Sequence, residues 1–507
     1  MFVPTYGWST VHSLGRQKKV TVETRKLLRQ AHVCTRTLCA RNNPSNNIYE
    51  DGIMSLRCDP FHRGCFKMDS VQIIRLFERK RAYIFLFGGF FVVEALLAMW
   101  TGHPYDMDIW FNTGSWMNQG INIYELPNHL GYPPLWSFWC LIAYRFYNFF
   151  GNNMEVWRLI IKLPLMLAHL ALTYRVGNFA LKEFGRKKAL RIFYLVLVWS
   201  FFLYVGALWG QTNTLSALLT FLAFEAMLNQ KTRKSALFLG LAVTLKLYPI
   251  IVFPAFFIFS LKRRGKHETR DFILFSTLVP LLITGVTFLV FRWNPQFFLN
   301  TMFYWVTPKG NKISGNMNFW PFLQVLNVDL VALWPIRYLW VFLVVGCMIF
   351  WLKKSTLKRS DFSFSIVSFY LIFIISYGWV SEQSFIDPLP FIFLVIIGYR
   401  HKLSNLYLGL LSIIQILMYA YSVNNWGLLI FEPLLNCVSP PLLSTVHNIY
   451  ADYGALIWTL RGTLGFIISL GLGIFLLIIW KPNYFTNKIG IIIKKLFPKR
   501  SQNENSV

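Results

Sequence analysis

Apolar runs long enough to cross a lipid bilayer as helices recur along almost the whole chain, and they constrain its fold more than any other feature. A helix needs about 20 mainly apolar residues to span the hydrocarbon core. Only 14% of the 507 residues are charged, whereas a soluble domain carries about 25%. The sequence therefore predicts an all-α polytopic membrane protein and excludes an ordinary soluble enzyme.

We predict about twelve transmembrane helices, because lipid offers the backbone no hydrogen-bond partner and a helix satisfies its own N–H and C=O groups. The predicted crossings are residues 82–101, 154–176, 192–209, 213–229, 236–247, 249–261, 271–292, 333–352, 362–380, 384–399, 406–422 and 455–479. The pair 236–247 and 249–261 is short, so we interpret it as a hairpin of half-length helices. Such broken helices are tolerated only beside protein or a wet cavity.

Basic residues lie mainly on one side of these crossings, which predicts their orientation. With the amino end in the cytoplasm, the only lysines and arginines of the outer loops are Arg145, Lys309 and Lys312. Cytoplasmic loops are the ones enriched in Lys and Arg. The net charge of +28 is thereby explained without a nucleic-acid partner. The compact loops favour a cell membrane over the endoplasmic reticulum.

The run 133–150 in the first outer loop could be a further crossing, but it carries Arg145 and has prolines and glycine at its ends. We predict instead a helix lying in the outer interface, so this loop would hold re-entrant or interfacial helices. Aromatic rings favour the headgroup region. The side chains expected at that depth are Trp136, Trp139, Tyr144 and Tyr147.

Two carboxylates, Asp106 and Asp108, follow the first crossing directly. We expect both in an exposed loop, where acids can serve solubility alone. Acids beside hydrocarbon are costly, however, and tend to be functional. A carboxylate here could act as a general base, or the two could hold a divalent cation.

Four further motifs follow in order along the chain: Gly120-x-x-x-Tyr124 with Tyr132-Pro-Pro-Leu135, Trp209-Gly-Gln-Thr-Asn213, Leu245-Lys-Leu-Tyr-Pro249 and Val380-Ser-Glu-Gln383. Together with the acidic motif they resemble the glycosyltransferase-C superfamily over roughly residues 82–400. The resemblance is strongest to polyprenyl-phosphate-mannose-dependent mannosyltransferases, those of family 87 and the catalytic subunit of the first GPI mannosyltransferase. The histidine that these enzymes carry near the last motif is absent here.

The resemblance implies a fold, a reaction and a division of the chain. A hexose, mannose in the resembling enzymes, would pass from a polyprenyl phosphate to a lipid-linked or glycan acceptor on the outer or lumenal face, typically with inversion. The implied catalytic transmembrane module is 68–400, followed by C-terminal helices in 401–480. Residues 1–67 are predicted to be a disordered basic extension or the result of a start assigned too early, and 481–507 a basic cytoplasmic tail.

The resemblance also assigns roles to individual residues. Asp106 is the first candidate for the base, because its spacing from Gly120 matches the family better than that of Asp108. Asp108 is the second candidate, or an orienting or metal-binding partner. Lys246 is the candidate for the donor phosphate, with snorkelling as the alternative. The other candidate substrate-binding residues are Tyr132, Gln211, Asn213, Tyr248, Glu382 and Gln383.

Several of these residues have simpler explanations. Gln211 and Asn213 could cap the next helix, Tyr248 could be an interface tyrosine, and Glu382 could be a helix-end carboxylate. His103 is interpreted as an interface residue, and Lys162 and His169 as packing groups. The loop 308–318 could be a mobile lid or a flexible turn.

Two other function classes fit a membrane protein of this composition. A transporter or flippase of a lipid-linked saccharide would need charges spread through its helices, often in two related halves. A structural assembly subunit would carry the acids incidentally. Release of polyprenyl phosphate from a lipid-linked sugar distinguishes a transferase from both.

Overall fold

The computed structural model describes residues 70–126, 132–306, 317–328, 338–378, 380–400, 403–424 and 427–480, with side chains of 70–83 and 303–306 left out. The chain divides into two compact units, 1–74 and 75–507, and the predicted site residues all lie in the second. Predictions for 1–67, for 481–507 and for most of the loop 308–318 fall outside the described residues. The boundary between 68–400 and 401–480 stays a prediction.

Helices account for nearly all of the described residues, and those residues contain no β-strand. In chain order they are α2 (Ser70–Trp100), α3 (Pro104–Asn118), η1 (Ile123–Glu125), α4 (Pro134–Phe149), α5 (Met154–Phe184), α6 (Arg186–Val198), α7 (Ser200–Leu203), η2 (Tyr204–Trp209), α8 (Asn213–Leu228), α9 (Thr232–Leu245), η3 (Tyr248–Val252), α10 (Phe253–Arg263), α11 (Lys266–Phe291), α12 (Pro295–Val306), α13 (Trp320–Val325), α14 (Leu339–Lys353), α15 (Arg359–Ser376), η5 (Glu382–Ile386), α16 (Leu389–Phe393), η6 (Leu394–Tyr399), α17 (Ser404–Val423), η8 (Gly427–Phe431), α18 (Glu432–Val438), α19 (Pro440–Asp452) and α20 (Gly454–Trp480). The predicted all-α class is confirmed.

The predicted count of about twelve crossings is not confirmed, although a helical segment occupies each predicted range. Among the described residues seven helices are long and apolar enough to cross a membrane, or eight if the bent pair α2–α3 forms one span. The axes of that pair differ by 86°, with Pro104 in the first turn of α3. Helix α8 and helix α14 are apolar but shorter. The protein is nonetheless an integral, multi-pass membrane protein.

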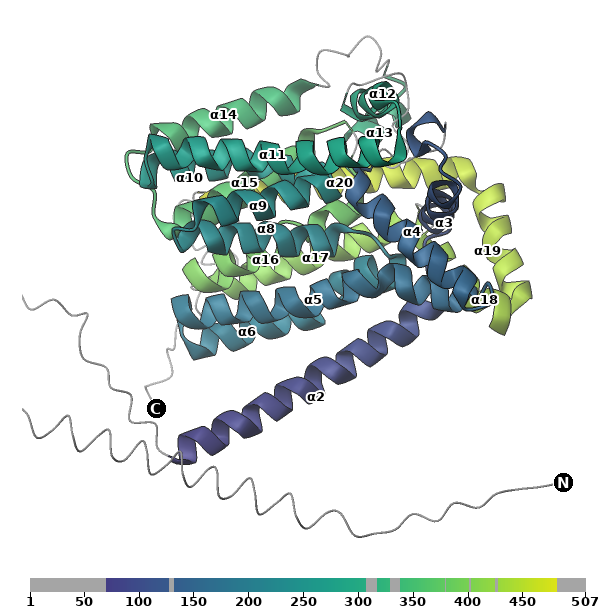
Figure 1. The fold of residues 1–507 in the computed structure, drawn as a ribbon, viewed down its shortest axis with the longest axis horizontal. Coiled ribbons are helices and arrows are strands. Elements are labelled where there is room, and N and C mark those ends of the chain that lie inside the picture. Colours follow the sequence, from purple (N-terminus) through teal and green to yellow (C-terminus); the bar gives the residue numbers. More distant parts are fainter. Residues whose placement is uncertain are drawn as a thin grey trace, which may run out of the picture. The chain divides into compact units, whose positions relative to one another are not determined.

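Helices α8, α9 and α11 run side by side, and α9 packs on both of its neighbours (Figure 1). Helix α9 has 14 residues, or about 21 Å at 1.5 Å per residue, which is less than the roughly 30 Å of a hydrocarbon core. It ends at Leu245, where Lys246 adopts an extended conformation before η3 and α10. A short helix, a break and a second short helix are the elements predicted for the hairpin.

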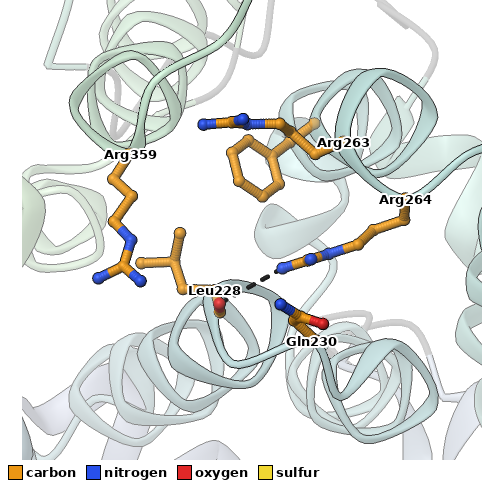
Figure 2. A pocket seen from close by; sticks show the side chains of 6 residues that line it. Leu228, Gln230, Arg263, Arg264 and Arg359 are labelled. Atoms are coloured by element: carbon orange, nitrogen blue, oxygen red, sulfur yellow. Dashed lines mark hydrogen bonds between the residues drawn. The ribbon is translucent and has the colours of Figure 1, made fainter. Parts of the chain in front are cut away.

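A pocket opens between α8, α10 and α15 at the end of the bundle where α8 terminates. It is lined by Leu228, Gln230, Phe259, Arg263, Arg264 and Arg359 (Figure 2). The opposite end of α8, which begins at Asn213, lies by contrast among the predicted site residues.

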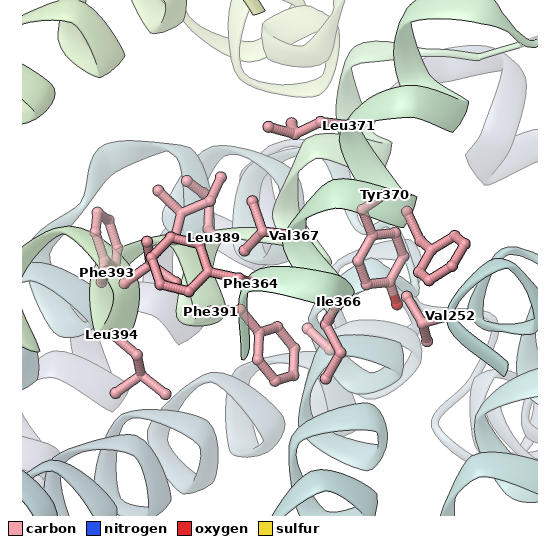
Figure 3. Close-up of a cluster of buried hydrophobic side chains, with 14 of the residues drawn as sticks. Val252, Phe364, Ile366, Val367, Tyr370, Leu371, Leu389, Phe391, Phe393 and Leu394 are labelled. Atoms are coloured by element: carbon pink, nitrogen blue, oxygen red, sulfur yellow. The ribbon is translucent and has the colours of Figure 1, made fainter. Parts of the chain in front are cut away.

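The interior of the bundle is built on α15 and on the segment η5–α16–η6. Figure 3 shows Phe364, Ile366, Val367 and Tyr370 of α15 against Leu389 and Phe391 of α16. The segment Glu382–Tyr399 is the most enclosed of the candidate spans, because 89% of its residues are buried. Close packing of this kind leaves side chains little freedom, so the polar residues at the start of the segment are held in fixed positions.

The run 133–150 forms helix α4, which packs on α3 and α5. That the aromatic rings of this helix lie at headgroup depth stays a prediction, but Trp136 faces protein, because its ring is only 2% exposed and packs edge to face on Trp110 with centroids 5.3 Å apart. Tyr144 and Tyr147 contact Phe111 of α3. These rings of α4 pack on α3 because aromatic pairs pack favourably in a protein interior.

Candidate functional site

Asp106 lies in the first turn of α3 and is buried, with 6% of its surface exposed. The expectation of an exposed loop carboxylate is therefore wrong for this residue. Its Oδ2 atom accepts two hydrogen bonds of 2.6 Å, from Trp209 Nε1 and from Gln211 Nε2. His103 stacks on the Trp209 ring, and its Nδ1 lies 3.6 Å from the same oxygen. Such donors stabilise a buried carboxylate and fix its orientation.

The two donors, Trp209 and Gln211, flank a sharp turn at the end of the π-helix η2. Gly210 ends this helix in the left-handed region, with φ 94°. A Cβ atom at Gly210 would lie 2.8 Å from Met107 Cε and 3.0 Å from Lys162 Cε. Glycine is thus required both by the backbone conformation and by the close packing. Single π turns inside helices are frequent at functional sites.

Lys162 holds the two halves of this turn region together from inside α5. Its side chain is fully buried, and Nζ donates to the carbonyl oxygens of Ala98 (3.1 Å), Thr101 (2.7 Å) and Leu208 (3.1 Å). Ala98 and Leu208 lie in the last turns of α2 and η2, and Thr101 directly follows α2. Carbonyls at the end of a helix lack helical partners and carry partial negative charge. The lysine thereby holds the segment that carries Asp106 close to the segment that carries Trp209.

A second cluster surrounds the start of α8. Asn213 Oδ1 accepts a 2.8 Å hydrogen bond from Lys246 Nζ, while Asn213 Nδ2 donates to Asp387 Oδ2 at 2.7 Å. Ser216 Oγ donates to the other oxygen of Asp387 at 2.7 Å. All four side chains are buried. A cation and an anion are therefore positioned on either side of one amide.

Tyr132 joins the two clusters. Its hydroxyl donates a 2.9 Å hydrogen bond to Gln211 Oε1, and its ring centroid lies 5.6 Å from Lys246 Nζ. The Tyr248 ring centroid lies 5.2 Å from the same ammonium. Burial raises the pKa of the Tyr132 phenol well above its ordinary value, and the Asp106 charge adds to this, so the phenol stays protonated and donates. Aromatic faces of this kind stabilise a cation.

Six of the predicted residues thus meet in one site: Asp106, Tyr132, Gln211, Asn213, Lys246 and Tyr248. Asp108 does not join them, because it is exposed on the other side of α3. Glu382 is buried and Gln383 is half-buried on η5, one turn before the cluster. The acid that reaches the partner of Lys246 is Asp387, which is five residues further along.

Asp387, Ser216 and the indole of Trp209 are site groups that were not predicted from the sequence. Asp387 could have been found, because it is an acid within the predicted crossing 384–399, and intramembrane acids are functional candidates by default. Trp209 opens the motif Trp209-Gly-Gln-Thr-Asn213, which points to it by position, whereas Ser216 carries no comparable signal, since serine is ordinary in membrane helices.

A divalent cation held by Asp106 together with Asp108 does not fit the geometry of α3. Residues two apart on a helix point in different directions, and here one carboxylate is buried while the other is exposed. Among the described residues no group of three or more His, Cys, Asp or Glu side chains could hold a metal ion.

A model described as glycosyltransferase family 87 matches residues 132–376, just under half of the chain. Over this segment the chain is similar to membrane glycosyltransferases, and the match supports the glycosyltransferase-C superfamily. The matched segment contains Tyr132, Gln211, Asn213 and Lys246. Asp106 and Asp387 lie before and after it, and only the fold brings them to the same site.

Solved structures similar to this chain include ArnT from Cupriavidus metallidurans bound to undecaprenyl phosphate, at 14% sequence identity and a TM-score of 0.44. That alignment covers 78% of this chain and 77% of the ArnT chain. No curated protein matches the sequence significantly.

Proposed function

We propose that the protein transfers a hexose, mannose by its family resemblance, from a polyprenyl phosphate to a hydroxyl of a lipid-linked or glycan acceptor. The observation that carries the proposal is the meeting of a buried carboxylate, Asp106, and a buried ammonium, Lys246, through Gln211 and Tyr132. Glycosyl transfer needs both charges, because a proton leaves the acceptor hydroxyl while negative charge builds on the departing phosphate.

Asp106 is proposed as the general base. Within the described residues, every hydrogen bond to its carboxylate goes to Oδ2. Those contacts fix the group and leave Oδ1 to meet an incoming hydroxyl. As the acceptor oxygen forms its bond to the anomeric carbon, the bond to the phosphate oxygen breaks and the hydroxyl proton passes to Asp106. Attack opposite the leaving group would invert the anomeric centre.

Lys246 is proposed to bind the donor phosphate. An ammonium has three donors, and the described hydrogen bond to Asn213 uses one of them. Asn213 and the two tyrosine rings hold the cation in place without neutralising it. A phosphate can therefore accept from the remaining hydrogens.

Asp387 acts in this proposal as a positioning residue. Because its carboxylate accepts from the Asn213 amide, it turns the amide oxygen of Asn213 toward Lys246. A lipid-borne donor approaches from within the bilayer, so we also propose that this end of the bundle lies at the outer or lumenal surface, in a cell membrane rather than the endoplasmic reticulum.

A transfer assay tests the function directly. Purified protein is incubated with several radiolabelled polyprenyl-phosphate sugars and a membrane lipid extract as the acceptor pool. We expect labelled glycolipid and free polyprenyl phosphate from the wild type and about 10²–10⁴-fold less from Asp106→Asn, as for loss of a general base. Unchanged transfer by Asp106→Asn would reject this residue as the base. Movement of intact lipid-linked saccharide without cleavage would instead identify a transporter.

A further inference from the structure

The pocket at the other end of α8 lies far from the transferase site. Helix α8 has 16 residues, so its two ends are about 24 Å apart at 1.5 Å per residue. The pocket has a volume of about 210 Å³, several times the roughly 30 Å³ that one water occupies in the liquid. The proposed transfer reaction uses none of the residues that line it.

Three guanidinium groups from two separate parts of the chain surround this pocket. Arg263 and Arg264 reach it from the end of α10, and Arg359 stands across from them at the start of α15 (Figure 2). Burial lowers the pKa of Arg264, and the charges of Arg263 and Arg359 lower it further while Glu268 opposes them. Like charges gathered around one concave space repel one another, so an anion in the pocket would relieve this repulsion.

The individual contacts show how these donors are held. Arg264 Nη2 donates to the carbonyl oxygens of Met227 (3.0 Å) and Leu228 (3.3 Å), the last turn of α8. Its Nε atom is buried and has no hydrogen-bond partner among the described residues. Arg359 Nη1 pairs with Glu183 Oε2 at 2.8 Å. Arg263 forms neither a hydrogen bond nor an ion pair within the described part of the chain.

We propose that this pocket binds a phosphate group, carried either by an anionic lipid headgroup or by a soluble anion. Guanidinium groups suit phosphate because their planar, forked donors match its oxygens. Glu183 pairs with Arg359 and the charge of Glu268 acts on Arg264, but the three arginines still outnumber these two carboxylates. Basic pockets among membrane helices suit lipid headgroups for the same electrostatic reason.

The test uses the full-length protein, freed of lipid in a neutral detergent. Binding of phosphatidylglycerol is followed by native mass spectrometry and by thermal unfolding, with phosphatidylcholine as the zwitterionic comparison and inorganic phosphate as the soluble probe. The variant Arg263→Gln with Arg359→Gln removes two of the three charges. It keeps Arg264, which donates to the last carbonyl groups of α8. The control, Arg186→Gln with Lys187→Gln, removes two exposed charges from the start of α6, outside the pocket.

We expect phosphatidylglycerol to bind the wild type and the control alike, and the pocket variant at least about tenfold more weakly, since two charged hydrogen-bonding groups are lost. If inorganic phosphate displaces the lipid, the pocket takes the anion itself; if it does not, the pocket needs the lipid headgroup. Equal binding of both probes by the pocket variant and the wild type would overturn the proposal. An equal loss of binding in the control variant would also overturn it. If the double variant does not fold, the single variant Arg263→Gln is measured in its place.

Discussion

Lys246 and Asp387 contact opposite ends of the same side chain, with the Asn213 amide accepting from the ammonium and donating to the carboxylate. The two charged residues come from segments far apart in the chain. The amide separates the charges, so the lysine is positioned by an acid without forming a direct ion pair with it. A direct pair would compete with a phosphate for the ammonium, whereas an amide oxygen competes less.

This arrangement predicts coupled effects on the donor. Lys246→Ala should raise the donor KM and can also lower turnover, because the ammonium contacts the phosphate before and during transfer. Lys246→Arg should rescue only part of this, since a planar fork does not replace a compact ammonium. Asp387→Asn should act in the same direction but more weakly. The double variant Lys246→Ala with Asp387→Asn should lose less than the sum of the single effects. Full additivity in donor titrations would contradict the positioning role.

Asp106→Asn should lower turnover by about 10²–10⁴-fold, the range for a lost general base. Because Asp106 is buried and accepts two hydrogen bonds, we also expect a loss of about 1 kcal/mol of stability, the difference between charged and neutral hydrogen bonds. Asp108→Asn is the matched control on the same helix and should stay near wild type, as an exposed residue. Equal defects in the two variants, measured as turnover and thermal unfolding, would show that the buried contacts do not select the base.

Gly210→Ala should impair both stability and transfer. An alanine in the left-handed region costs about 1–3 kcal/mol, and its Cβ would also push against Met107 and Lys162. The displaced turn would move Trp209 and Gln211 away from Asp106. Gly151→Ala is the control, because Gly151 has a φ of 69° but open space around its Cβ position. If both variants lose the same stability and keep activity, the close packing at Gly210 has no role in the site.

Lys162→Met should destabilise the protein and disturb the site without touching a substrate. The change leaves the carbonyls of Ala98, Thr101 and Leu208 without their buried donor, and each unsatisfied group costs about 1–3 kcal/mol. Lys182→Met, an exposed position on the same helix, should have little effect. Thermal unfolding and transfer assays on both variants check this, and similar behaviour of the two would argue against the tethering role of Lys162.

Much of the site was accessible from the sequence because its residues stand in short motifs. Trp209-Gly-Gln-Thr-Asn213 and Leu245-Lys-Leu-Tyr-Pro249 each supply side chains that meet in the structure. Within a motif the local backbone sets the direction of each side chain, so a few neighbouring residues carry the information. Gly210 shows this plainly, because its left-handed φ turns Trp209 and Gln211 toward one carboxylate.

The apolar runs by themselves determined that the chain is helical and lies in a membrane, since lipid forces the backbone to satisfy its own hydrogen bonds. Only the tertiary structure decided which acid of the pair Asp106 and Asp108 is buried, that Trp136 faces Trp110, and that Asp387 reaches Asn213. These outcomes depend on how distant helices pack. Hydropathy along the chain measures how much surface must leave water, but it does not say which other segment will cover that surface.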